Sequence, residues 1–593
     1  MKTQRFTQMI RTTLLMATTA LLAAPTFADS FEFSAVSAPT TDAQKRAVQA
    51  SDSVTIGGET VKIGYHILAR SGQKIGDGTW GLLVDRTGKP VRSEDGSEHI
   101  SVDTDFSSLL PVGKKLFSVS HFESRPGAMY VTELDQDPET GVLTPISTRP
   151  VDFSDVGGLW VPCAGSVTPW GTHFGSEEYE PDAREVAAAE ELADVDDYFY
   201  PMARYFGLNP SEMTLDQFRA VFNPYSFGHP TEVTVTEDGN ATAAKHYAMG
   251  RLSIELPYVM PDSRTAYITD DGTNVGLYMF VADAAGNLDA GTLYAAKLTQ
   301  TSDEGAGAFD LTWVDLGHAT SDAVKKIIDD KPSFFDIFET ADPAEGGACG
   351  DGFTSINTTA GHECLKVRDG MDLAASRLET RRYAAMMGAT TELRKEEGIT
   401  FDPENNRMFL AMSEVAKGME PQSKNDIGGP DSVRVARNEC GAVYQLSVAP
   451  DTAIGSDYVV KDMASLVEGR PAEYAADSEF AGNTCDIDGI ANPDNLTYMT
   501  GHDTLIIGED TGSGHQNDAI WAYDMTSGDL TRIFTTPYGS ETTSPYWYPD
   551  INGFGYLMGV IQHPYGESDE DKLADPADAM AYAGYFGPFP ASK

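Results

Sequence analysis

The sequence predicts a mainly β protein with a six-bladed β-propeller-like fold and helical insertions. Apolar and aromatic residues alternate with a period of two in runs separated by Asp/Gly turns, as in 128–146, 275–298 and 519–534. Such hairpins recur along most of the chain, and radial repetition of sheets leaves few exposed strand edges. The spacing is too irregular to count blades, but six fit the length. A pair of β-sandwich domains is the alternative architecture.

Two segments depart from this pattern, near 181–222 and 371–392. Both are rich in residues that favour helices and have helical spacing, and the TLDQ stretch from Thr214 is typical of a helix start. We expect them to be helical insertions in the loops of a single catalytic domain that spans 29–593.

The N-terminal residues have the features of a secretory signal. Lys2, Arg5 and Arg11 precede an apolar run at 12–25, and small residues at 26–28 offer a cleavage site. The apolar run is shorter than the roughly 20 residues that span a bilayer. The sequence therefore predicts a signal peptide at 1–28 and a mature protein that is periplasmic or secreted, without membrane insertion.

The chain is strongly acidic, with a formal net charge of −48. Without residues 1–28, which carry three basic and no acidic side chains, the net charge becomes −51. This field repels nucleic acid and anionic membranes, and it also repels a phosphate-bearing substrate. The acidity is explained either by solubility or by carboxylates gathered around cations such as Ca²⁺, which takes oxygen ligands.

Five cysteines are present, so pairing in an oxidising compartment leaves one over. Cys349 and Cys364 lie in one Gly-rich loop and form a candidate pair, and Cys440 with Cys485 is a second candidate. Sequence does not determine this connectivity. With these pairs, Cys163 is the odd thiol.

Acidic residues beside Arg, Gln or His recur at turns and strand ends. Arg251 and Glu255 are four apart, which places them on one face of an extended strand. The same alternation predicts that Arg394 and Glu396 share a face and that Glu397 lies on the other. Convergence of such groups from separate strands is typical of a site at a propeller axis.

These motifs resemble the PhoX family of exported alkaline phosphatases. The most specific match is CAG-x-x-TPWGT-x-x-x-x-EE, from Cys163 to Glu178. Further matches follow in family order: GR-x-x-x-E at 250–255, Asp-Asp at 270–271, R-x-E at 394–396, NPDNL at 492–496 and IQHP at 561–564. The resemblance covers about residues 100 to 570.

The resemblance implies a propeller with iron and calcium at its centre that hydrolyses small-molecule phosphate esters outside the cytoplasm. The implied metal ligands are Cys163, Glu178, Glu255, Glu396, Asp494 and Asp510. Arg394 would hold the substrate phosphate, and Arg394 and Glu396 are the expected catalytic residues. A thiolate suits iron and carboxylates suit Ca²⁺, and bound metals would offset the repulsion of phosphate. We expect a monomer.

Two other functions remain open. In the first, the chain is a non-catalytic, calcium-binding propeller module of the same family. In the second, it is a calcium-dependent propeller hydrolase of lactones or sugars. Measuring bound iron and phosphomonoester hydrolysis distinguishes these alternatives from the phosphatase.

Overall fold

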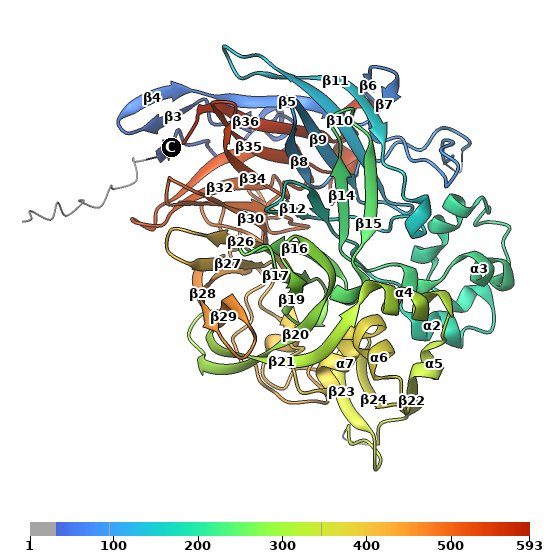
Figure 1. Ribbon diagram of the computed structural model, residues 1–593. Coiled ribbons are helices and arrows are strands. Elements are labelled where there is room, and N and C mark those ends of the chain that lie inside the picture. The colour runs from blue at the N-terminus through green and yellow to red at the C-terminus, as the bar shows by residue number, and fades with distance from the viewer. Residues whose placement is uncertain (1–30, 94, 345–346, 593) are drawn as a thin grey trace, which may run out of the picture.

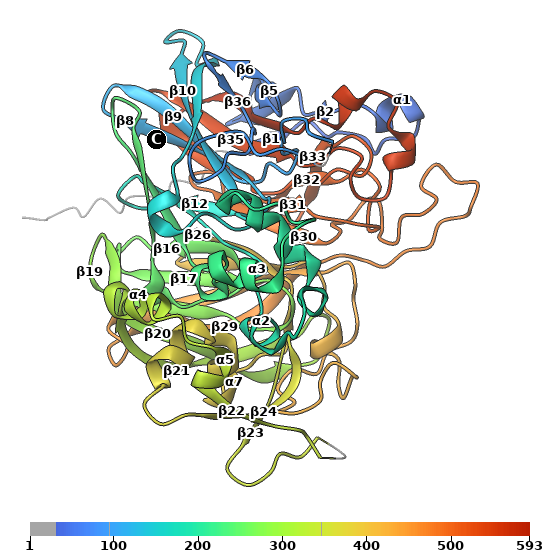
Figure 2. The ribbon, with the colours of Figure 1, turned by 90° about the vertical axis from the view of Figure 1, so that its right-hand side faces the viewer.

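Six antiparallel blades surround a central axis in the computed structural model, which describes residues 31–93, 95–344 and 347–592 (Figures 1 and 2). In each blade the first four strands from the axis are consecutive in sequence and pair as neighbours, except that β18 (Thr273–Val275) is left out of blade 3 and β5 (Gly64–Arg70) is the fourth strand of blade 6. The predicted mainly β, six-bladed propeller with helical insertions is confirmed. Its turn-rich hairpins each expose an apolar face that only a neighbouring blade can cover.

The first three blades use the following strands, given from the axis outward. Blade 1 contains β8 (Ser107–Val112), β9 (Lys115–Phe122), β10 (Ala128–Gln136) and β11 (Leu143–Pro150). Blade 2 contains β12 (Gly165–Val167), β13 (His173–Gly175), β14 (Thr231–Val235) and β15 (Ala241–Lys245). Blade 3 contains β16 (Ile254–Val259), β17 (Thr265–Asp270), β19 (Tyr278–Ala284), β20 (Asn287–Ser302) and β21 (Ala308–Thr320).

The other three blades are built in the same way. Blade 4 contains β26 (Glu396–Asp402), β27 (Arg407–Met412), β28 (Ala442–Asp451) and β29 (Ser456–Glu468). Blade 5 contains β30 (Pro493–Met499), β31 (Thr504–Glu509), β32 (Ala519–Asp524), β33 (Leu530–Thr535) and β2 (Gln49–Ala50). Blade 6 contains β34 (Tyr546–Ile551), β35 (Phe554–Ile561), β36 (Tyr582–Pro590) and β5 (Gly64–Arg70).

Two pairings join distant parts of the chain. The start of β21 pairs with β29, at Ala308–Asp310 and Asp462–Ala464, so blades 3 and 4 form one nine-stranded sheet. The N-terminal strand β5 pairs with the C-terminal strand β36 and supplies the outermost strand of blade 6. The ring is therefore closed by strands from both ends of the described chain, which removes a free edge.

The hydrophobic core lies between the blades rather than in one central mass. Leu110, Val131 and Val233 pack between blades 1 and 2, for example, and Leu496 and Trp521 belong to a cluster that includes blade 4 residues. Similar clusters of buried residues fill the other junctions. Since the apolar side chains pack between blades, the axis is left to polar residues.

Helices gather on one side of the propeller, at the right of Figure 1. They are α2 (Ala183–Ala188), α3 (Leu215–Val221), α4 (Ser321–Asp329), α5 (Phe334–Ile337), α6 (Asp372–Leu378) and α7 (Thr380–Met386). The helices α2, α3, α6 and α7 fall in the two segments with helical spacing, whereas α4 and α5 were not anticipated. The remaining helix, α1 (Asp42–Lys45), lies near blade 5.

The short strands outside the blades are β1 (Phe31–Phe33), β3 (Ser53–Ile56), β4 (Glu59–Lys62), β6 (Lys74–Ile75), β7 (Gly78–Thr79), β18 (Thr273–Val275), β22 (Phe338–Ala341), β23 (Thr354–Thr358), β24 (Gly361–Val367) and β25 (Leu393–Arg394). The signal peptide expected at 1–28 lies outside the described residues. Within the part of the chain that is described, no helix is both long and apolar enough to cross a membrane.

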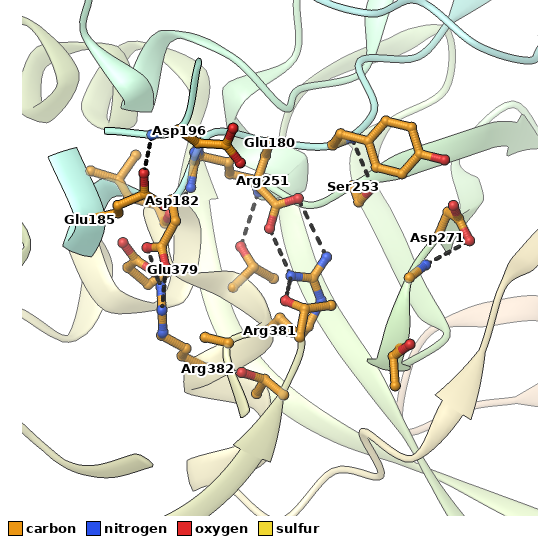
Figure 3. Close-up of a pocket in the computed structure, with 18 of the residues that line it drawn as sticks. Glu180, Asp182, Glu185, Asp196, Arg251, Ser253, Asp271, Glu379, Arg381 and Arg382 are labelled. Atoms are coloured by element: carbon orange, nitrogen blue, oxygen red, sulfur yellow. Dashed lines mark hydrogen bonds and ion pairs between the residues drawn. The ribbon is translucent and has the colours of Figure 1, made fainter. Parts of the chain in front are cut away.

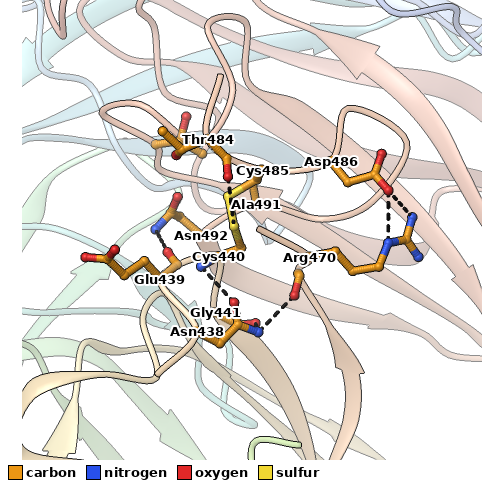
Figure 4. Close-up of a disulfide and its surroundings, with 12 residues drawn as sticks. Asn438, Glu439, Cys440, Gly441, Arg470, Thr484, Cys485, Asp486, Ala491 and Asn492 are labelled. Carbon is orange, nitrogen blue, oxygen red and sulfur yellow. Dashed lines mark hydrogen bonds and ion pairs between the residues drawn. A yellow bond between two sulfur atoms is a disulfide. The ribbon is translucent and has the colours of Figure 1, made fainter. Parts of the chain in front are cut away.

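Both candidate disulfides are present. Cys349 pairs with Cys364 and Cys440 with Cys485, while Cys163 is a buried free thiol. Figure 4 shows the second disulfide beside Asn492, whose backbone N–H donates to the Cys440 carbonyl at 3.0 Å. A cross-link over 45 residues stabilises a fold by about 4 kcal/mol in the chain-entropy model. It tethers the segment that leads into β30.

Candidate metal centre and active site

The innermost strand of each blade begins with a polar side chain at the axis. These residues are Asp105 before β8, Cys163 before β12, Glu255 in β16, Glu397 in β26, Asp494 in β30 and Thr543 before β34. All six line one cavity of about 300 Å³, which we call the axial cavity. One side chain from each blade therefore converges on a single site.

The second strand of several blades ends at the same cavity. Glu123 follows β9, Glu178 lies shortly after β13, Asp510 follows β31 and Gln562 follows β35, and all four line the cavity. In an antiparallel hairpin the end of the second strand lies beside the start of the first. The hairpin geometry therefore adds four polar groups to the six that begin the innermost strands.

A bulge aims the acid in three of these innermost strands. In β16, β26 and β30 the pairing register shifts around Glu255, Glu397 and Asp494. In each case the residue just before the acid pairs with the second strand, and regular pairing resumes at least two residues beyond the acid. Bulges re-aim side chains at the rims of sheets. Gly398 permits this in β26, because a Cβ there would lie 2.5 Å from Asn495 Cα.

A chain of neutral histidines holds the backbone of Cys163. His121 Nδ1 lies within hydrogen-bond distance of the Cys163 carbonyl oxygen, so this nitrogen carries the proton. His121 Nε2 then accepts from His173 Nε2 at 2.6 Å, and His173 Nδ1 accepts from the Ser108 hydroxyl at 2.8 Å. Burial lowers the pKa of His121 to about 4, which keeps the ring neutral.

Glu177 and Glu178 have different environments although they are adjacent. Glu177 makes a fully buried ion pair with Lys245 at 2.8 Å, and it accepts a hydrogen bond from the Trp160 backbone N–H at 2.9 Å. Glu178 donates its backbone N–H to the Val161 carbonyl and lines the axial cavity. Glu177 therefore holds the loop together, while Glu178 faces the site.

The donor atoms in the cavity form a connected series of clusters. Asp105, Glu123 and Cys163 bring one ligand atom each within 4.8 Å of one another. Cys163 does the same with Glu178 and Glu255. The Cys163 Sγ lies 3.4 Å from an Asp105 oxygen and 3.3 Å from a Glu255 oxygen. The thiol therefore stands between two groups of carboxylates.

Two further clusters contain no sulfur. Glu255 belongs also to a group with Glu397 and Asp494, again with all ligand atoms within 4.8 Å. Glu541, His563 and Glu567 form another such group at the edge of the cavity. Thiolates suit iron and oxygen donors suit Ca²⁺, so this donor set fits both kinds of ion.

These acids cannot all be ionised side by side without cations. Burial raises the pKa of Glu178, Glu255 and Asp494 well above the usual range, and neighbouring carboxylates raise it further. Burial also raises the pKa of Glu123 to about 8 and that of Asp105 to about 6. A multivalent cation would remove this mutual repulsion, which is the physical reason to regard the cluster as a metal centre.

Most of the sequence-predicted ligands meet at the axial cavity, but Glu396 does not. Cys163, Glu178, Glu255, Asp494 and Asp510 all line it, together with Glu397 in place of Glu396. The resemblance placed Glu396 among the ligands, whereas alternation only placed Glu397 on the face opposite to Arg394 and Glu396. Lys395 and Glu397 line the axial cavity and Arg394 and Glu396 do not, so the alternation is present. Lys395 has a φ of +50°, and the bulge in β26 follows directly and aims Glu397 at the axis.

Arg394 also lies outside the axial cavity. Its Nε donates to Glu414 at 2.9 Å, and its side chain faces a second cavity of about 580 Å³. This side cavity is lined by residues within 179–199, 251–253, 271–273, 358–360 and 378–382, as well as Arg394. The cation that reaches the acidic cluster from this segment is Lys395, whose Nζ lies 2.9 Å from Glu397 and 3.3 Å from Asp510.

Arg125 is the second cation of the axial cavity. Its guanidinium stacks 3.6 Å from the centre of the Tyr198 ring, and its buried Nε has no hydrogen-bond partner among the described residues. An Arg held by an aromatic ring with a free donor is ready to bind an oxyanion. Lys395 and Arg125 are thus the positive groups available beside the acids.

Glu396 is a buried carboxyl whose two oxygens both lack a hydrogen-bond partner among the described residues. Burial raises its pKa well above 4.5, and Asp270 and Glu397 add to the effect. Because the folded state then binds more protons than the unfolded chain, stability is lost as pH rises from 4.5 toward the folded pKa, at about 1.4 kcal/mol per pH unit. We expect Glu396→Gln to remove this loss and to raise the melting temperature at pH 8 relative to the parent.

Melting curves of the parent and of Glu396→Gln at pH 5, 7 and 8 check this expectation. Glu473→Gln, at an exposed position, is the matched control and should follow the parent at every pH. A melting-temperature difference between parent and Glu396→Gln that does not change with pH would contradict the expectation that burial raises the pKa of Glu396.

Sequence reasoning missed Asp105, Lys395, Glu397 and Glu541 as site residues. The sequence does contain a signal for such residues. In each blade, a polar residue lies just before or at the beginning of the apolar run that forms the innermost strand. Recognising it requires knowing which strand of each blade is innermost. Sequence alternation alone does not reveal that.

A six-bladed propeller with a thiol and a dense group of buried carboxylates at its axis defines a class of β-propeller hydrolase with a metal-dependent site. The family model described as "Alkaline phosphatase PhoX" matches residues 138–564. The chain therefore belongs to the PhoX alkaline phosphatase family, whose members are phosphoric monoester hydrolases.

Comparison of folds agrees with this membership. The chain is similar to Pseudomonas fluorescens PhoX in complex with vanadate, with 17% identity, a TM-score of 0.57, and coverage of 94% of this chain and 98% of that one. It is more distantly similar to a putative 6-phosphogluconolactonase from Bacteroides uniformis, with 12% identity, a TM-score of 0.27, and coverage of 76% and 85%. No curated protein matches in sequence.

Proposed function

We propose that the protein is an exported phosphatase that hydrolyses phosphomonoesters at a centre of iron and calcium ions in the axial cavity. The observation that carries the proposal is the position of Cys163 between two carboxylate groups, with oxygen-only clusters alongside. The related Pseudomonas protein binds vanadate, a transition-state analogue, which supports phosphoryl chemistry for a fold of this kind.

The donor chemistry suggests how the ions are distributed. Cys163 would ligate iron, together with Asp105 and Glu123 on one side and Glu178 on the other. The group without sulfur, formed by Glu255, Glu397 and Asp494, would hold calcium. Asp510, 3.3 Å from Lys395, is an additional oxygen donor at the same cavity.

When bound, the ions would polarise the phosphoryl oxygens and lower the pKa of the attacking water. Lys395 and Arg125 would orient the phosphate and stabilise the charge that develops on its equatorial oxygens. Arg394 and Glu396 are replaced in these roles by Lys395 and Glu397, because only the latter pair lines the cavity. The histidine chain beneath Cys163 would fix the thiol in place.

The proposed location outside the cytoplasm has support besides the leader sequence. Two disulfides are present in the described residues, and disulfides persist mainly in oxidising compartments. The strong negative charge also favours solubility in such a setting.

Elemental analysis of the purified protein together with a phosphomonoester assay tests the proposal. We expect both iron and calcium in the protein, hydrolysis of 4-nitrophenyl phosphate, loss of hydrolysis on calcium chelation, and recovery when calcium is returned. Iron and calcium without hydrolysis would indicate the non-catalytic module. Full hydrolysis by protein that contains no iron would overturn the role given to Cys163.

A further inference from the structure

The side cavity adjoins the axial cavity and shares a wall with it. Tyr179 lines both cavities, and the residue is 41% exposed. Tyr198 lines the side cavity while its ring stacks on Arg125, which lines the axial one. A phosphate ester held by Arg125 would therefore have its organic part directed past these two tyrosines.

The arginines of the side cavity are already paired. Arg381 binds Asp270 at 2.8 Å and Glu180 at 2.7 Å, and Arg382 binds Glu363 and Glu379, each at 2.7 Å. Figure 3 shows Glu180 facing Arg381, and Glu379 and Asp182 beside Arg382. These guanidinium groups therefore serve as structural cations and have few donors left for a ligand.

The third arginine of the side cavity, Arg251, donates hydrogen bonds to backbone carbonyl groups. Arg251 donates from Nε to the Phe227 carbonyl at 2.8 Å and from Nη1 to the Leu378 carbonyl at 3.2 Å. Arg394 is paired with Glu414, as described above. Each arginine of the side cavity thus already has a carboxylate or carbonyl partner, which disfavours a second anion site there.

The remaining charges of the side cavity are negative. Six carboxylates line it, against four guanidinium groups. Glu185 and Asp196 lie together at the upper left of Figure 3, where Glu185 accepts the backbone N–H of Asp196. Asp196 in turn accepts the backbone N–H of Tyr198 at 2.9 Å. This rim repels an anion and attracts a cation.

The apolar part of the side cavity is aromatic. Tyr179, Tyr198 and Phe199 all line it. Aromatic rings bind planar groups by stacking and cations through their faces. Their position beside Arg125 places this surface where the ester's alcohol part would lie.

We infer that the side cavity binds the alcohol part of the phosphomonoester and selects uncharged or cationic alcohols over alcohols that carry further negative charge. This inference rests on the proposed function, because it requires phosphate at the axial cavity. It adds a substrate class: monoesters of neutral or ammonium-bearing alcohols, in preference to polyphosphates and phosphorylated acids.

The test compares kcat/KM of the metal-loaded enzyme for three phenyl phosphates that differ in one meta substituent. The substituents are carboxylate, the isosteric neutral carboxamide, and trimethylammonium, and methyl phosphate is included because it is too small to reach the side cavity. We expect the carboxylate to be the poorest aryl substrate and the ammonium the best. Each change of charge should alter kcat/KM by about two- to fivefold, and the difference should shrink in 1 M salt.

The double variant Glu185→Gln/Asp196→Asn keeps the hydrogen-bond acceptors and removes two charges. It should raise kcat/KM for the carboxylate ester and lower it for the ammonium ester, each by about two- to fivefold, and leave methyl phosphate unchanged. The matched control is Glu212→Gln/Asp216→Asn, which removes two exposed charges from the same helical segment but not from the side cavity. It should change none of these values.

The outcomes separate the two proposals. Hydrolysis of methyl phosphate with no charge preference among the aryl esters, or with a preference for the carboxylate, overturns the inference about the side cavity and leaves the proposed function standing. A selectivity that is the same in the double variant and the parent also overturns the inference about the side cavity and leaves the proposed function standing. No hydrolysis of any ester overturns both.

Discussion

Replacing Cys163 with serine should reduce kcat/KM for 4-nitrophenyl phosphate more than about 100-fold, because even groups that only support metal ligands change activity by about 10–100-fold. The Cys163 Sγ lies within 3.4 Å of oxygens from both Asp105 and Glu255, so it links the two carboxylate groups. A serine hydroxyl is harder and is not deprotonated near neutral pH, so iron should be lost together with activity.

Iron content and kcat/KM of the purified Cys163→Ser variant are the measurements. The control is Cys349→Ser/Cys364→Ser. These two cysteines form a disulfide with each other, and neither of them lines the axial cavity. This control should keep its iron and its activity. A Cys163→Ser protein with full iron content and parental kcat/KM would show that the thiol is not a ligand.

The second large effect should come from Lys395 rather than from its neighbour Arg394. Lys395 lies 2.9 Å from Glu397 in the axial cavity, whereas Arg394 pairs with Glu414 and faces the side cavity. Removing one group that stabilises transition-state charge costs about 10²–10³-fold in kcat. We expect Lys395→Met to show such a loss and Arg394→Met to stay within about fivefold of the parent, as for a partly exposed ion pair.

Steady-state kinetics and vanadate inhibition of Lys395→Met, Lys395→Arg and Arg394→Met test this expectation. Lys395→Met should weaken vanadate inhibition, and Lys395→Arg should recover part of the lost activity because it restores a cation. Iron and calcium content measured on the same samples separates an effect on phosphate from an effect on metal retention. A larger loss in Arg394→Met than in Lys395→Met would restore the assignment made from the sequence.

The acidic residues of the site were largely predictable as a set, but their individual orientations were not. Glu178 and Glu255 were expected at one site, and both line the axial cavity. Glu396 and Glu397 are adjacent, and a two-residue period places them on opposite faces without saying which face meets the axis. Lys395 and Glu397 line the axial cavity, whereas Arg394 and Glu396 do not, and the bulge in β26 aims Glu397 there.

Residues from the first blade were the hardest to anticipate. Asp105 and Glu123 precede the segment that matches the family model. They reach Cys163 because blade 1 packs between blades 6 and 2 and aims its first hairpin at the axis. Arg125 comes shortly after the same hairpin in the chain. Its stacking on Tyr198 depends on the helical segment between β13 and β14.

The sequence by itself determined the mainly β class, an odd number of cysteines and the kinds of side chain at the site. Strand alternation, turns and cysteine number depend only on near neighbours and composition, so they can be read without a structure. The tertiary structure decided which carboxylates share the axis, that Lys395 replaces Arg394 there, and that a second cavity adjoins it. These depend on strand register, on the bulges and on closure of the ring by β5 and β36, which are set by contacts between residues far apart in the chain.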